Sequence, residues 1–104
     1  MKVRFEIAFT VLLAAGCQTP PQPVNYAGGD GSCCQKAVVI NNAKFRETGE
    51  LAERLWLDQR YPGRQETKQS SLDSAGRHFD VINLATADGR KATVYFDATD
   101  WFAK

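Results

Sequence analysis

Apolar and polar positions predict four strands and one helix between residues 36 and 104. Lys36–Asn41 contains the β-branched run Val38-Val39-Ile40, which is typical of a short strand. Further strands are expected at Gln65–Leu72, Arg77–Thr86 and Lys91–Asp97. Gln65–Leu72 is rich in Ser, Thr and Gln, which is typical of an edge strand.

The segment between Asn42 and Arg60 has the periodicity of an amphipathic helix. At about 100° per residue, its large apolar residues fall within one arc of about 140°. We therefore expect this arc to pack on the core. Its members are Phe45, Leu51, Ala52, Leu55 and Trp56. Tyr61-Pro62-Gly63 ends the helix, since the residue before proline avoids the helical conformation.

Turn signals separate the last three strands. Ser74-Ala75-Gly76 predicts one turn and Asp88-Gly89 a second, tight hairpin. The resulting β-α-β-β-β order predicts an α+β fold, with one amphipathic helix packed on a small antiparallel sheet. In Arg77–Thr86 the alternation slips after Val81, which predicts burial on both faces or a bulge. The pattern leaves open whether Lys36–Asn41 joins the sheet.

Residues 1–16 have the form of a secretory signal. Lys2 and Arg4 precede an uncharged run of about ten residues, which is shorter than the roughly 20 residues that span a membrane. The run ends in Leu13-Ala14-Ala15-Gly16-Cys17, which resembles the lipobox of bacterial lipoproteins. The resemblance implies cleavage before Cys17, lipid on its thiol, and anchoring in the cell envelope. An ordinary secretory signal with a free Cys17 is the alternative.

Two further properties indicate the cellular location and the domain boundary. Gln18 follows the cysteine, and the same resemblance implies transport to the periplasmic face of the outer membrane in a Gram-negative cell. Residues 17–35 carry three prolines and then three glycines among polar residues, a composition that favours a flexible tether. The folded domain is therefore expected at residues 36–104.

Charge and composition exclude several classes of function. The full chain has a formal charge of +1, and without residues 1–16 its basic and acidic residues are equal in number. Nucleic-acid binding needs a basic surface, so we expect no nucleic-acid partner. The chain has a single histidine and no Cys-x-x-Cys motif. We therefore expect neither a metal site nor a cofactor.

Cys33 and Cys34 are the remaining cysteines, and export would place them in an oxidising compartment. They are expected to form a strained disulfide with each other or to stay reduced. Disulfides to a partner and a redox or metal role are the alternatives.

Candidate polar sites are few. Asp97 and Asp100 could share a cation, but such residues more often cap turns. His78 lies two residues before Asp80 and could be combined with Ser70 or Ser71, yet no nucleophile-elbow sequence accompanies them. We expect a surface histidine and a protein that is not an enzyme.

Aromatic residues supply the candidate partner-binding surface: Tyr95, Trp101 and Phe102. Tyr95 is expected to point away from the core. Trp101 and Phe102 are expected to fold back and close the core, and if exposed they would form an apolar patch for a partner.

The stretch Thr86–Asp97, following a helix that contains Ala52 and ends at Tyr61-Pro62-Gly63, looks like the layout of PepSY-type domains. The resemblance covers about residues 43–97. It implies a small α+β module of the cell envelope, of a kind found in proteins that modulate or inhibit peptidases and in lipoproteins of unknown role. It assigns no functional residue.

Together these features predict a membrane-anchored envelope lipoprotein whose domain binds a protein or peptide. The exposed edge at Gln65–Leu72 could accept a strand from the partner. The alternatives are an inhibitor, immunity or exclusion protein that acts on an envelope hydrolase or an incoming factor, and a redox or metal role for Cys33 and Cys34.

Overall fold

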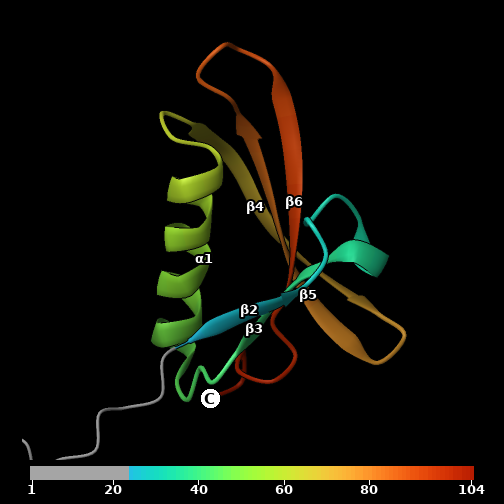
Figure 1. The fold of residues 1–104 in the computed structure, drawn as a ribbon. Coiled ribbons are helices and arrows are strands. Elements are labelled where there is room, and N and C mark those ends of the chain that lie inside the picture. Colours follow the sequence, from blue (N-terminus) through green and yellow to red (C-terminus); the bar gives the residue numbers. More distant parts are fainter. Residues whose placement is uncertain (1–23) are drawn as a thin grey trace, which may run out of the picture.

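The computed structural model describes residues 24–104. The predicted signal peptide, the lipid site at Cys17 and the first part of the tether lie outside these residues. The fold is α+β, with one α-helix packed against one face of a five-stranded mixed sheet (Figure 1). No helix in the described part of the chain has the length and apolar content needed to cross a membrane.

The elements follow one another as β2, η3, β3, α1, β4, β5 and β6. Their bounds are β2 Asn25–Gly28, the 3₁₀ turn η3 Cys34–Lys36, β3 Val38–Asn41, α1 Arg46–Arg60, β4 Gln65–Ser74, β5 Arg77–Ala85 and β6 Lys91–Asp97. The order across the sheet is β2-β3-β6-β5-β4, which makes β2 and β4 the two edges. The predicted polar edge strand is confirmed as β4, and Val38–Asn41 does join the sheet.

The last three strands form an antiparallel meander, as predicted. Ala75 and Gly76 both have positive φ, as a two-residue turn of the mirror-image type requires, and they connect β4 to β5. The second hairpin runs from Ala85 to Lys91 through Asp88 and Gly89. Its loop is longer than the two-residue turn that Asp88-Gly89 predicts, because the Thr86 N–H bonds to the Arg90 carbonyl oxygen and leaves residues 87–89 between them. Pairing between β5 and β6 is continuous, and the register shift lies instead in β4, between Glu66 and Lys68.

The three strands of the meander are antiparallel, whereas β3, whose place in the sheet the sequence left open, lies parallel to β6 and makes the sheet mixed. Val38 pairs with Phe96, and both side chains are fully buried. The opposite edge of the meander, β4, is polar and exposed. The apolar β3 therefore adds beside β6, where its Val38 and Ile40 side chains enter the core.

The folded part extends beyond the predicted boundary at residue 36. Asn25–Gly28, assigned to the tether, pairs antiparallel with β3 and forms an edge of the sheet. Tyr26 faces the helix, where its hydroxyl donates a 2.7 Å hydrogen bond to the carbonyl oxygen of Ala52. The Gly31 N–H bonds to the carbonyl oxygen of Lys36, and the Gly31 carbonyl oxygen accepts the N–H of Tyr95, so this loop is attached to the edge of β6. The folded part therefore begins by Asn25.

Only one flank of the predicted apolar arc packs on the core, together with residues beside the arc. Gly49, Ala52, Glu53 and Leu57 are buried and Trp56 is half-buried. Phe45, Leu51 and Leu55 are exposed. Small residues at 49 and 52 allow the helix to approach Trp101 and Tyr26 closely, which turns one flank of the apolar arc toward the sheet and leaves the other flank open.

Candidate functional site

An apolar groove lies between the helix and the N-terminal edge strand. Leu51 and Leu55 on α1 are 54% and 52% exposed, and Tyr26 of β2 forms the facing wall. The groove has a volume of about 480 Å³. We call it the α1–β2 groove, and it is lined by Val24, Tyr26, Thr48, Leu51, Ala52, Leu55, Asp58 and Gln59. It lies along the flank of the helix that does not pack on the sheet.

A smaller, polar hollow lies between α1 and β4. Its volume is about 70 Å³. Its polar lining residues are Glu50, Glu53, Arg54, Glu66 and Gln69. Two of the carboxylates already have cationic partners, since Arg46 contacts Glu50 at 3.3 Å and Arg64 contacts Glu66 at 2.8 Å. Of the three carboxyl groups in this hollow, Glu53 is the one without an ion pair among the described residues.

Glu53 is buried in the helix–sheet interface, with only 3% of its surface exposed. Burial is the main cause that raises the pKa of Glu53, to about 10, and a hydrogen bond to Asp80 together with that carboxylate's charge adds to it. Glu53 is thus a neutral acid at pH 7. Its Oε2 atom has no hydrogen-bond partner among the described residues.

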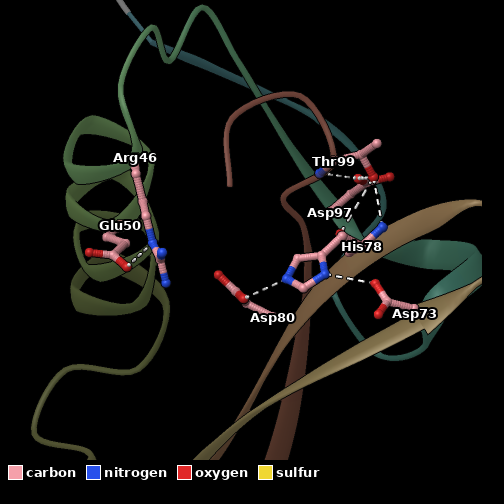
Figure 2. A network of polar contacts seen from close by, with 7 residues as sticks. All are labelled: Arg46, Glu50, Asp73, His78, Asp80, Asp97 and Thr99. Carbon is pink, nitrogen blue, oxygen red and sulfur yellow. Dashed lines mark hydrogen bonds and ion pairs between the residues drawn. The ribbon is translucent and has the colours of Figure 1, made fainter. Parts of the chain in front are cut away.

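Asp80 lies between Glu53 and the only histidine of the sequence, His78. Figure 2 shows His78 between Asp73 of β4 and Asp80 of its own strand. His78 Nδ1 lies 2.7 Å from Asp73 Oδ1, and Nε2 lies 3.9 Å from Asp80 Oδ1. The ring of Phe102 stacks on His78 with centroids 3.8 Å apart. Both ring nitrogens therefore face carboxylates, and no hydrogen bond among the described residues joins the ring to Ser70 or Ser71.

Asp97 fixes the C-terminal segment to the sheet (Figure 2). Its carboxylate accepts a 2.5 Å hydrogen bond from Arg77 Nε, and others from the backbone N–H and the hydroxyl of Thr99. Burial alone would raise the pKa of Asp97, but these hydrogen bonds outweigh burial and hold it below its ordinary value. Asp97 caps a turn, as predicted, while Asp100 is exposed.

The three aromatic candidates have different positions. Trp101 is only 1% exposed, so the prediction that it closes the core is confirmed and its role in a partner-binding patch is ruled out. Phe102 is half-buried against His78, and Tyr95 is half-buried on the sheet face opposite Phe96. The three side chains therefore do not form one exposed patch.

Cys33 and Cys34 are free thiols, half-buried at the start of η3. Of the two alternatives expected for this pair, a strained disulfide or reduced thiols, the structure has the reduced one. Among residues 24–104, no three His, Cys, Asp or Glu side chains converge in a way that could hold a metal ion.

The sequence pattern did not identify Glu53 as a buried group. By helical periodicity it falls outside the apolar arc, together with the other charged residues of the helix. Its burial follows from the rotation of the helix toward the flank that carries Gly49 and Leu57.

Comparisons with known proteins give no further information about the site. No protein family, no curated protein and no solved structure matches this chain.

Proposed function

We propose that this chain is a lipid-anchored protein of the bacterial envelope whose domain binds an extended segment of a partner protein by strand addition at β4. The observation that carries the proposal is β4 itself. This edge strand is ten residues long, pairs only with β5, and has nine exposed residues. An unpaired strand edge presents backbone donors and acceptors that an extended peptide can bind.

Features of β4 restrict which strands can add to it. The charge of Lys68 and the register shift beside it disfavour pairing of β4 with the β4 edge of a second copy of the protein. The hollow between α1 and β4 then offers selectivity through side chains. Residues of the added strand that face the helix would lie beside Glu66 and Gln69, so we expect polar side chains there.

The membrane anchor rests on the lipobox at Leu13–Cys17. Lipid chains at Cys17 would hold the protein at a membrane, since stable anchoring needs more than one acyl chain. Gln18 favours the periplasmic face of the outer membrane in a Gram-negative cell. The intact mass of the mature protein from native membranes tests this anchor. We expect a chain that begins at Cys17 and carries acyl groups, and an unlipidated mass would contradict it.

Site-specific photo-crosslinking in intact envelopes tests the binding proposal. A photoreactive residue at Lys68 or Ser71 of β4 is expected to capture a defined partner, and the same residue at Asp88, exposed in the β5–β6 loop, serves as the control. Capture at Asp88 alone, or at none of these positions, would count against strand addition. Capture of an envelope hydrolase, with loss of its activity in the complex, would identify the inhibitor alternative.

A further inference from the structure

Exposed apolar side chains gather at the edge of the domain where the chain enters it. The described residues include five exposed large hydrophobic residues. They are Tyr26, Phe45, Leu51, Leu55 and Leu72. Tyr26, Leu51 and Leu55 line the α1–β2 groove, and Phe45 directly precedes the same helix. Only Leu72 lies elsewhere, on the edge strand β4.

These side chains form a surface along the helix rather than isolated exposures. Leu51 and Leu55 are one helical turn apart on α1, and Tyr26 of β2 lines the same groove. Helical periodicity predicts an apolar arc of about 140° on α1, and the sheet covers only one flank of this arc. An apolar surface of this kind marks an interaction site.

The length of the N-terminal segment indicates what covers this surface. Val24, in the wall of the groove, is seven residues from Cys17. Seven residues span at most about 25 Å. A lipid on Cys17 would therefore keep the groove within that distance of the membrane surface, whereas β4 lies at the opposite edge of the sheet.

We infer that the α1–β2 groove docks on the lipid bilayer, with Leu51 and Leu55 inserted at the membrane interface. This inference rests on the lipid anchor of the proposed function. The docking is shallow, because the unpaired backbone of the β2 edge would lose its hydrogen bonds to water in the hydrocarbon region. Side chains enter the interface, as in amphipathic helices that lie in the plane of a membrane.

Docking in this way would orient the whole domain. The sheet order places four strand spacings between β2 and β4, which is about 19 Å. With β2 on the membrane, β4 is directed away from the lipid surface. The edge that is proposed to accept a partner strand is then presented to the periplasm.

Spin labels on two exposed leucine positions test the inference in the mature, lipidated protein. The protein carries Cys33→Ser and Cys34→Ser, and a nitroxide at either Leu55→Cys or Leu72→Cys. It is reconstituted into vesicles of phosphatidylethanolamine and phosphatidylglycerol. We expect the label at 55 to be relaxed more by membrane-dissolved oxygen than by a water-soluble nickel complex, and the label at 72 to show the opposite. Leu51→Cys provides a second reporter in the groove.

The outcomes separate the anchor from the docking. Failure of the protein to float with the vesicles would overturn the anchor, and the docking with it. Flotation with equal nickel accessibility at positions 55 and 72 would leave the anchor standing and overturn the docking. A label at 55 that is shielded from both relaxants would also overturn it, since another protein or a second copy would then cover the groove.

Discussion

Gly49 of α1 lies against the indole ring of Trp101, so that a Cβ atom at residue 49 would overlap the ring. Trp101 is fully buried and belongs to the core, although it lies only three residues before Lys104. This contact sets how closely the helix approaches the C-terminal segment. It also explains why the helix turns its glycine flank, rather than its leucine flank, toward the sheet.

Gly49→Ala is therefore expected to destabilise the domain, although alanine is the better helix former. Overpacking of this kind costs about 1–3 kcal/mol. Urea unfolding measures the loss, with the exposed Gln59→Ala as a control that should change stability by less than about 0.5 kcal/mol. In a Trp101→Leu background the cost of Gly49→Ala should shrink. An equal cost in both backgrounds would show that the ring is not the cause.

The buried acid Glu53 predicts a stability that falls as pH rises. Its pKa is about 10 in the folded protein, against about 4.5 for an exposed glutamate, so between these values the folded state holds a proton that the unfolded state releases. Stability from this group is complete below about pH 4.5 and is lost progressively up to about pH 10. Glu53→Gln should remove this slope and raise the free energy of unfolding at pH 7 by on the order of 2–3 kcal/mol.

Denaturant unfolding at pH 5, 7 and 8 checks this prediction. Glu50→Gln is the matched control, because Glu50 is on the same helix, lines the same hollow and pairs with Arg46 near the surface. A wild-type protein whose stability does not change between pH 5 and 8 would contradict the burial of a neutral acid at this position.

The lowered pKa of Asp97 predicts a free energy of unfolding that decreases as the pH falls into the acidic range. Its pKa is held below the ordinary value, so its contribution is present above about pH 4 and is lost as the pH falls through the pKa of the folded state. Asp97→Asn should cost about 1–2 kcal/mol at pH 7 through the weakened hydrogen bonds from Arg77 and Thr99. The difference from the wild type should narrow near pH 3. A constant difference at both pH values would show that the charge of Asp97 is irrelevant.

Strand addition at β4 predicts an alternating response to proline. Neighbouring residues of an edge strand direct their N–H groups to opposite sides, one toward β5 and one toward the free edge. Of Ser70→Pro and Ser71→Pro, one should reduce stability by removing a bond within the sheet. The other should keep the fold and lose crosslinking to the partner. Full crosslinking by both folded variants would argue that β4 does not bind through its backbone.

The positions of the two free thiols predict that neither is needed for partner binding or membrane association. Cys33 and Cys34 lie at η3, and neither lines the α1–β2 groove or the hollow beside β4. Replacing both by serine should therefore leave partner crosslinking and membrane association unchanged. Loss of either property in the double variant, with an unchanged melting temperature, would instead support a role for the thiols.

Local patterns were sufficient to predict much of the fold. The helix, the three strands of the meander, the two turns and the polar edge strand all follow from periodicity and turn residues that are close in the sequence. Each of these features depends on contacts within a few residues or between adjacent elements. The same kind of argument predicted that Trp101 would close the core and that Asp97 would cap a turn.

The candidate sites depended on tertiary structure. Periodicity gave an arc of about 140° on the helix, but which flank meets the sheet depends on Gly49, Trp101 and Tyr26, which are distant in the sequence. That choice buries Glu53 beside Asp80 and exposes Leu51 and Leu55. The strand Asn25–Gly28 likewise looks like a tether in sequence, because it becomes a strand only through pairing with β3 and the Tyr26 bond to Ala52. Local patterns thus specify most of the elements, whereas long-range packing selects the strand β2 and the faces that form the core and the sites.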